Sequence, residues 1–363
     1  MAFVVSRKFK VHIMIQIICE VENMKKRTLC VIFGGKSNEY EVSLRSAYEV
    51  LSHIDKEKYD LIMLGITKNG EWYIFEGEIE EILKDTWHKG SALPVTLDLS
   101  SGHLLVLDKS IYARNVDVFF PVMHGEMVED GRLQGLFDIA GVRYVGCNSF
   151  TSHICMDKAL TKEAAIKCGI PVANGIVLNK KSRGSVDKID FPVFIKPCMS
   201  GSSIGVTRAE NNEELKRGID VALKYCDSIL IEEEITGKEI EVAVIETKGG
   251  LLATSVGMVR HGQKIYDYDT KYNSANVEYL IPAPIEEKTI KQVRECAKKL
   301  FLKLGCKGLA RVDFFVDDKG NVIFNEVNTL PGFTKDSMYP KLITSIGYSY
   351  EKMLDTLIDS SFA

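Results

Sequence analysis

The chain has 363 residues, of which 45% are hydrophobic and 26% are charged, and its formal net charge is -4. This composition is typical of globular proteins, and a usual domain size of roughly 100–200 residues predicts two or three structural units. Acidic and basic residues are interspersed, which argues against a nucleic-acid-binding surface. The nine cysteines are scattered and form no CxxC pair, so the sequence predicts neither a disulfide framework nor a zinc site. A cytoplasmic location is expected.

The N-terminal residues differ from the rest of the chain. The apolar stretch at residues 11–19 is too short to span a bilayer, and no small-residue cleavage site follows it. Three basic residues follow Met24 directly, so we expect residues 1–26 to be an N-terminal extension that begins at an upstream start. The alternative is a weak membrane-surface or signal-like segment, which Glu20 and Glu22 disfavour because they interrupt the apolar pattern.

The first unit begins near Leu29, where short apolar runs start to alternate with segments of helical period. This alternation is typical of an α/β protein with a largely parallel sheet. Strands are expected at residues 29–33, 59–66 and 116–122. Two helices are expected from apolar residues that share one helical face, namely Leu44, Ala47, Tyr48 and Leu51 in the first and Leu133, Leu136, Phe137 and Ala140 in the second.

The second unit is expected to begin with a helix at residues 157–168, which Gly169 and Pro171 end. Strands at 192–197 and 228–232 follow. The third unit is expected to contain a strand at 240–245, a long helix at 286–304, and strands at 309–316 and 322–327.

The last two strands are predicted to form a hairpin through the turn at Asp317-Asp318-Lys319-Gly320-Asn321. A symmetric turn centred between Lys319 and Gly320 places Asp313 opposite Glu326 and Arg311 opposite Asn328, all on one face of the sheet. Two opposed acids repel unless a cation lies between them, and a ligand set of oxygen atoms suits Mg²⁺ or Mn²⁺. The alternative is a solvated face whose acids pair with lysines.

Three loops at the carboxyl ends of predicted strands contain groups that suit ligand binding. The small-residue loop Lys196 to Gly205 allows backbone N–H groups to approach phosphate oxygens, although a plain turn is the alternative. Glu39 or Glu41 follows the turn after the first strand; either acid could hold an ammonium group or simply favour a helix N-terminus. The loop 124–131 combines a histidine with three acids. Gly35-Lys36-Ser37 lacks the upstream glycine of a Walker A loop and the turn lacks GxGxxG spacing, so neither nucleotide fingerprint is predicted.

Taken in order, a series of motifs from about residue 28 to the C-terminus resembles the D-alanine–D-alanine ligase family. The motifs are Gly34 to Leu44, His124 to Gly131 with Gln134-Gly135, Met156-Asp157-Lys158, Lys196 to Gly205, Tyr266 to Tyr272, Gly308 to Asp313 and Asn325 to Thr334. The resemblance implies an ATP-grasp fold with an N-terminal open parallel-sheet domain at 27–148, a central domain at 149–238 and a C-terminal domain at 239–363. It also implies a cytoplasmic, homodimeric enzyme of peptidoglycan synthesis.

The resemblance also implies roles for individual residues. Those matching nucleotide-binding positions are Lys158, Lys196, Ser203, Glu232, Ile235, Glu239 and Lys271. Those matching the ligands of two Mg²⁺ or Mn²⁺ ions are Asp313, Glu326 and Asn328. Those matching catalytic or substrate-binding positions are Glu39, His124, Ser202, Tyr272, Arg311, Gly332, Ser337 and Met338. Residues 266–276 are expected to form a lid that excludes water.

The family resemblance implies that two D-alanine molecules are joined with consumption of ATP, but leaves the acceptor open. Residues 70–73 and Thr86-Trp87 resemble the D-alanine–D-serine resistance ligases, whereas Met338 stands where those enzymes tend to have Arg. Tyr272 is similar to the D-alanine-adding enzymes rather than to the D-lactate-adding ones. A regulatory protein that has lost catalysis is a further alternative. Val128 stands where the family more often has glycine, which questions the geometry of the His124 loop.

Overall fold

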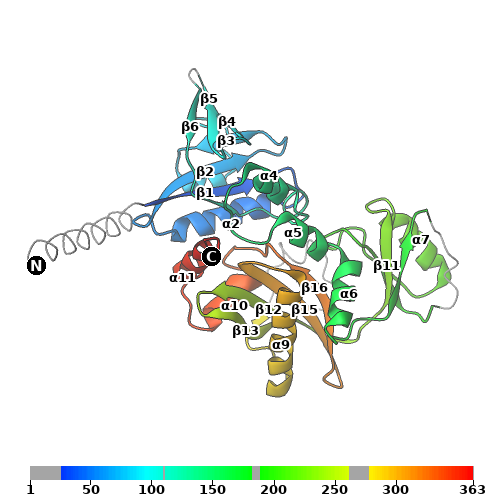
Figure 1. The fold of residues 1–363 in the computed structure, drawn as a ribbon. Helices are drawn as coiled ribbons and strands as arrows, with labels where there is room; N and C mark the ends of the chain where they lie inside the picture. Colours follow the sequence, from blue (N-terminus) through cyan, green and yellow to red (C-terminus); the bar gives the residue numbers. More distant parts are fainter. Residues whose placement is uncertain (1–25, 109–110, 182–188, 261–277, 363) are drawn as a thin grey trace, which may run out of the picture.

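A computed structural model describes residues 26–108, 111–181, 189–260 and 278–362, and its strands form three separate sheets (Figure 1). The first sheet has seven strands in the order β6-β5-β4-β3-β2-β1-β7. Its strands are β1 (Arg27–Gly34), β2 (Tyr59–Ile66), β3 (Trp72–Phe75), β4 (Leu93–Leu97), β5 (Leu104–Leu107), β6 (Ile111–Arg114) and β7 (Val118–Pro121). The helices in this part of the chain are α2 (Tyr40–His53), α3 (Ile79–Leu83) and α4 (Arg132–Ala140).

The expectation of a parallel sheet holds only for β2, β1 and β7. These three strands pair in parallel, whereas β3, β4, β5 and β6 are added as antiparallel strands. The connection from β2 to β3 spans only residues 67–71, which suffices for an antiparallel hairpin but not for the crossover that a parallel strand needs. Trp87 lies fully buried against Phe33 and Phe75, so this antiparallel part contributes to the core.

The second sheet is antiparallel and has the order β10-β9-β11-β8. Helix α7 (Asn212–Ala222) packs against it, and Asn211 caps α7 by accepting hydrogen bonds from the N–H groups of Glu213 and Glu214. Two helices, α5 (Ser149–Met156) and α6 (Lys158–Lys167), precede this sheet, where the sequence predicted a single one. The strands are β8 (Gly175–Asn179), β9 (Val193–Pro197), β10 (Thr207–Ala209) and β11 (Ser228–Glu233).

The third sheet is also antiparallel, with the order β14-β13-β12-β15-β16 and helices on both faces (Figure 1). Side chains alternate along β12: Val242 and Val244 belong to the core that contains α9, whereas Ala243 and Ile245 belong to the core that contains α10 and α11. The elements are β12 (Gly237–Thr247), β13 (Gly250–Arg260), β14 (Glu278–Leu280), α9 (Glu287–Leu304), β15 (Leu309–Asp317), β16 (Val322–Asn328), α10 (Met338–Ser345) and α11 (Tyr350–Ser360).

The hairpin of β15 and β16 has the predicted register where the charged side chains lie. Asp313 pairs with Glu326, and Arg311 pairs with Asn328. The turn itself differs from the prediction, because Val316 pairs with Val322 and the turn is therefore centred on Lys319. A β-bulge between Asp313 and Phe314 shifts the pairing by one residue. On the side of the bulge away from the turn, from Asp313 back to Arg311, the pairs have the predicted register.

One hydrophobic core joins the first and third sheets and fixes the position of the loops between them. It contains Val31 and Phe33 of β1 together with Phe333, Tyr339 of α10 and Leu354 of α11. Helix α2 lies beside α11, and the N- and C-terminal parts of the described chain are therefore neighbours (Figure 1). None of the helices in the described ranges has the length and apolar character needed to cross a membrane.

Candidate functional site

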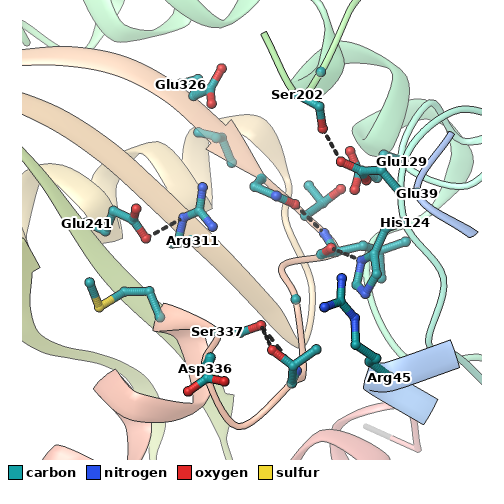
Figure 2. A pocket seen from close by; sticks show the side chains of 18 of the residues that line it. Glu39, Arg45, His124, Glu129, Ser202, Glu241, Arg311, Glu326, Asp336 and Ser337 are labelled. Atoms are coloured by element: carbon teal, nitrogen blue, oxygen red, sulfur yellow. Dashed lines mark hydrogen bonds and ion pairs between the residues drawn. The ribbon is translucent and has the colours of Figure 1, made fainter. Parts of the chain in front are cut away.

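A cavity of about 430 Å³ lies where loops from all three sheets meet (Figure 2). Ten residues that the sequence singled out line it: Glu39, His124, Lys158, Ser202, Arg311, Glu326, Asn328, Gly332, Ser337 and Met338. Sequence reasoning missed several other polar lining residues, among them Arg45, Glu49, Glu241 and Asp336, and it gave no separate role to Glu129 of the loop 124–131. Arg45 and Glu49 follow Glu41 at intervals of four residues and therefore share one face of α2. This helical periodicity could have identified them.

Glu39 and Glu41 have different surroundings in the structure. Glu41 is exposed and pairs with Lys68 at 2.5 Å, whereas Glu39 is buried. Glu39 occupies the N-cap position of α2, but its carboxylate does not cap that helix; it accepts a hydrogen bond from the Ser202 hydroxyl (Figure 2). Ser202 has a positive φ of 50°, a left-handed conformation that directs the loop after β9 towards the first unit. An acid and a hydroxyl from two distant units thus meet in the cavity.

His124 connects the first unit to the loop after β16. Its Nδ1 lies 3.2 Å from the carbonyl oxygen of Leu330, and its Nε2 lies 2.9 Å from the Ser46 hydroxyl. A carbonyl can only accept, so Nδ1 carries the proton and Nε2 accepts from Ser46. The Ser46 oxygen in turn accepts from the N–H of Phe333. Burial lowers the pKa of His124, which favours the neutral ring that this arrangement requires.

The valine in the His124 loop is compatible with its position. The left-handed conformation in this loop is adopted by Met127, with a φ of 75°, and by Gly125 and Gly131, while Val128 is not among the positive-φ residues. The Val128 side chain is instead buried in the core of the first unit. A β-branched residue is therefore accommodated without backbone strain.

Glu129, in the same loop, is a second acid beside Glu39. An added Cβ on Gly201 would lie 3.7 Å from the Glu129 Oε2, which places this carboxyl against the loop that contains Ser202. Burial, reinforced by the negative charge of Glu39, raises the pKa of Glu129 to about 8. The cavity therefore contains a carboxyl group that is largely protonated at neutral pH.

Arg311 is held by two carboxylates at the floor of the cavity. Its Nε and Nη2 bind the two oxygens of Asp313 at 2.9 and 2.7 Å, and Nε also lies 3.0 Å from Glu241. Asp313 itself is buried below Arg311. Glu326 lies 3.6 Å from the ammonium of Lys158. Within the described ranges, no three His, Cys, Asp or Glu side chains form a group that could hold a metal ion, so the expected ligand set depends on the oxygen of Asn328.

A buried charge cluster is formed by side chains of α6, β9 and β11. Glu232 pairs with Lys196 at 2.6 Å and with Lys162 at 2.7 Å, and these two lysines lower its pKa although burial alone would raise it. Burial lowers the pKa of Lys162, whereas at Lys196 the attraction of Glu232 outweighs burial and raises the pKa. Lys162 escaped sequence analysis, although it lies one turn after Lys158 on α6.

Apart from Lys158, the expected nucleotide-binding residues that the structure describes do not line the cavity described above. They lie on β9 and β11, in the connections from β9 to β10 and from β11 to β12, and at the start of β12: Lys196, Ser203, Glu232, Ile235 and Glu239. Ser203, like Ser202, is left-handed, with a φ of 58°. Lys271 and Tyr272, together with the expected lid at 266–276, lie outside the described residues.

The loop before α10 forms another wall of the cavity. Ser337 occupies the N-cap position of α10 but does not cap it; its hydroxyl oxygen instead accepts from the N–H of Thr334 at 3.1 Å. The N–H groups of Met338 and Tyr339 at the start of α10 therefore remain available to a ligand, whereas the next residue, Pro340, has no N–H. Gly332 allows this loop conformation, since a Cβ added to it would lie 2.5 Å from the Ser337 hydroxyl oxygen. Met338 is buried against Gly257. A Cβ added to Gly257 would lie 2.6 Å from the Met338 sulfur.

Two family models match most of the chain. The model described as D-ala D-ala ligase N-terminus matches residues 28–147, and the model described as D-ala D-ala ligase C-terminus matches residues 166–359. The D-alanine–D-alanine ligase of Acetivibrio thermocellus is 41% identical over 361 residues, which cover 92% of this chain and 95% of that relative. D-alanine–D-alanine ligase B of Clostridium tetani is 41% identical and covers 93% and 94%.

Solved structures show the same relationship. The VanG D-Ala:D-Ser ligase of Enterococcus faecalis is similar with a TM-score of 0.86 and 37% identity, covering 93% of this chain and all of that one. A D-alanine–D-alanine ligase of Bacillus anthracis in complex with ATP has a TM-score of 0.69 and 26% identity, covering 93% and 97%. These likenesses confirm the predicted ATP-grasp fold. From residue 28 onward, the chain belongs to the D-alanine–D-alanine ligase family.

Proposed function

We propose that the protein joins two D-alanine molecules into D-alanyl-D-alanine with consumption of ATP, for peptidoglycan synthesis. The observation that supports this most directly is the cavity, in which groups suited to an amino acid and to a transferring phosphoryl group come together from three units. Glu39 offers a negative charge, Arg311 a positive one, and the start of α10 a set of backbone N–H groups. The similarity to named ligases over more than nine-tenths of the chain agrees with it.

The two D-alanine substrates would be oriented by opposite walls of the cavity. Glu39 binds the ammonium group of the first D-alanine, and the Ser202 hydroxyl fixes the position of the Glu39 carboxylate. The second D-alanine places its carboxylate at the N-terminus of α10, near Ser337, because unpaired N–H groups and the helix dipole favour an anion there. Gly332 and Met338 then shape the space around its methyl group.

ATP would extend from the cavity into the central unit. Glu232 and Ile235 lie on the side where the adenine binds, while Lys196 and Lys158 direct positive charge towards the phosphates. The loop after β9 adds backbone N–H groups at Ser203, whose left-handed conformation helps to form an anion-binding concavity. Glu239, exposed at the start of β12, would bind the ribose.

The donor set of the hairpin fits Mg²⁺ or Mn²⁺. Asp313, Glu326 and Asn328 offer only oxygen atoms, and the Asn328 oxygen is oriented by a hydrogen bond from the N–H of Leu330 at 2.9 Å. These three residues would hold two ions, which when bound neutralise charge on the transferring phosphoryl group. In the described structure Arg311 supplies the positive charge next to Asp313.

The reaction activates a carboxylate, which is a poor acyl donor. The carboxylate of the first D-alanine attacks the γ-phosphorus of ATP, so that an acyl phosphate forms and ADP leaves. The amine of the second D-alanine then attacks the acyl carbon, and inorganic phosphate leaves as the amide forms and the amine loses a proton. Arg311 stabilises the oxyanion of the tetrahedral intermediate. His124 holds the loop after β16 in place as a neutral ring.

Several broader features belong to the same proposal. Each sheet forms the centre of one unit, with boundaries near residues 148 and 238. The enzyme works in the cytoplasm, where ATP is available, and as a homodimer.

The test is ATP turnover with D-alanine alone and with equal D-serine, followed by mass analysis of the dipeptide. We expect D-alanine alone to support phosphate release and D-alanyl-D-alanine to dominate in the mixture. No phosphate release would overturn the ligase in favour of a regulatory protein. Mainly mixed D-alanyl-D-serine would overturn the acceptor, in the direction of the similar VanG enzyme.

A further inference from the structure

A row of three acids crosses the third sheet below the cavity. Glu241 on β12 pairs with Asp313 on β15, and Asp313 pairs with Glu326 on β16. The side chains of Glu241 and Asp313 are only 11% and 4% exposed. Directly opposed acids repel, and burial makes this repulsion stronger. Two of the three have a place in the proposed metal site, whereas Glu241 has none.

Arg311 connects Glu241 to this row. Its Nε–H donates a hydrogen bond to Asp313 at 2.9 Å, and Nε also forms an ion pair with Glu241 at 3.0 Å, while Nη2 binds only Asp313. The residue opposite Arg311 on β12 is Ala243, whose small side chain leaves room for the guanidinium to reach Glu241 two positions away. Among the described residues, no hydrogen bond involves Nη1, and Arg311 lines the cavity (Figure 2).

The two carboxylates differ in what the proposed reaction demands of them. Asp313 binds Arg311 through both of its oxygens, and a metal ion bound by Asp313 would compete with the guanidinium for these oxygens and weaken the pairing. Arginine has a long, flexible side chain, and losing one partner would allow its guanidinium to turn away. Glu241 lies on a different strand and outside the proposed ligand set, so its contact with Nε can persist when Asp313 changes partner.

We propose that Glu241 is a positioning residue, which retains Arg311 with its guanidinium towards the reacting atoms while Asp313 binds metal. This inference rests on the proposed ligase function and adds to it the means by which the arginine is preorganised. Electrostatic stabilisation is effective only if the donor is already in place when charge develops. In this role Glu241 acts through Arg311 and not directly on substrate or metal.

The experiment compares the full-length chain with Glu241→Gln, which keeps the size but removes the charge. We expect kcat to fall about 10-fold to 100-fold, with the KM values for ATP and D-alanine changed less than about 3-fold, because the lost interaction matters in the transition state. Glu241→Asp keeps the charge and should recover part of kcat. Glu213→Gln is the matched control, since Glu213 forms an exposed pair with Arg217 on α7, and it should retain the parent kcat.

Two further measurements separate positioning from other roles. In a double-mutant cycle, Glu241→Gln should reduce kcat by less than about 3-fold once Arg311→Lys is present, because both changes remove one function. Mn²⁺ affinity, measured by calorimetry with a non-hydrolysable ATP analogue, should change less than about 3-fold in Glu241→Gln, because Glu241 is not a ligand. Melting temperatures establish that each variant is folded.

The inference is overturned if folded Glu241→Gln retains the parent kcat, or if the losses from Glu241→Gln and Arg311→Lys multiply independently. A parallel loss of Mn²⁺ affinity would also overturn it, in favour of direct metal binding. If Glu241→Gln does not fold, Glu241→Asp decides in the same cycle: a partial loss of kcat that disappears once Arg311→Lys is present supports positioning, whereas the parent kcat or an independent loss refutes it. Dipeptide formation by the parent tests the proposed function separately.

Discussion

Replacing Glu129 with Gln should change how the stability of the protein depends on pH. Folding raises the pKa of this carboxyl from 4.5 to about 8, because it is buried beside Glu39. The folded protein therefore holds the proton more tightly than the unfolded chain, and unfolding releases a proton between pH 4.5 and 8. It follows that stability falls as the pH rises through this window. Gln cannot titrate, so the variant should lack this loss.

The expected change in the free energy of unfolding follows from the pKa shift of Glu129. At about 1.36 kcal/mol per pH unit, the full shift corresponds to an upper limit of about 5 kcal/mol above pH 8. Glu129 lines the cavity and is partly exposed to it, and solvent there reduces the cost of the charge. Between pH 6 and pH 9, we therefore expect the free energy of unfolding of the variant to rise by about 2 kcal/mol relative to that of the parent.

The assay is thermal unfolding of parent and variant at several values of pH from 6 to 9. The melting temperature of Glu129→Gln should rise relative to the parent by several degrees across this range. Glu126→Gln is the matched control, because Glu126 belongs to the same loop but is exposed and pairs with Arg132. Parallel profiles for the parent and Glu129→Gln would refute the assignment of a protonated Glu129.

Three further outcomes are expected. Asp313→Ala should abolish turnover and leave the fold largely intact, and activity within a few-fold of the parent at saturating Mg²⁺ would contradict its role as a ligand. Met338→Arg should move acceptor preference from D-alanine towards D-serine, because Arg can donate hydrogen bonds to the added hydroxyl; competition between the two acceptors, read by mass analysis, checks this. Gly65→Ala should destabilise the protein by about 1–3 kcal/mol, because its Cβ would lie 2.3 Å from the Trp87 ring, whereas Gly90→Ala, with nothing within 4 Å, should leave the melting temperature unchanged.

The hairpin of β15 and β16 shows how far local sequence rules reach. Alternation and turn position together predicted that Arg311, Asp313, Glu326 and Asn328 share one face, and the observed register agrees. The prediction of the turn centre was wrong by half a residue, and the bulge after Asp313 compensated for it. Neither feature has a clear signal in the residues of the turn, because bulges depend on how the strands pack against their neighbours.

The antiparallel wing of the first sheet shows a different limit. Its strands β3 to β6 are short, and apolar runs of four or five residues do not reveal their partners. Trp72 and Trp87 stood out in the sequence only through the resemblance to known ligases. In the structure, Trp87 is fully buried and packs against Phe33 and Phe75, so it is a core residue of this sheet.

The sequence by itself determined several of the helices and strands, the shared face of the hairpin residues and the loops at strand ends, because neighbours along the chain govern periodicity and turns. Only the tertiary structure decided that Glu39 meets Ser202 rather than capping α2, that Ser46 and Leu330 hold His124 as a neutral ring, and that Glu241 shares Arg311 with Asp313. Each of these contacts joins segments far apart in sequence. Such contacts depend on which surfaces the cores bring together, and no local pattern in the chain encodes that choice.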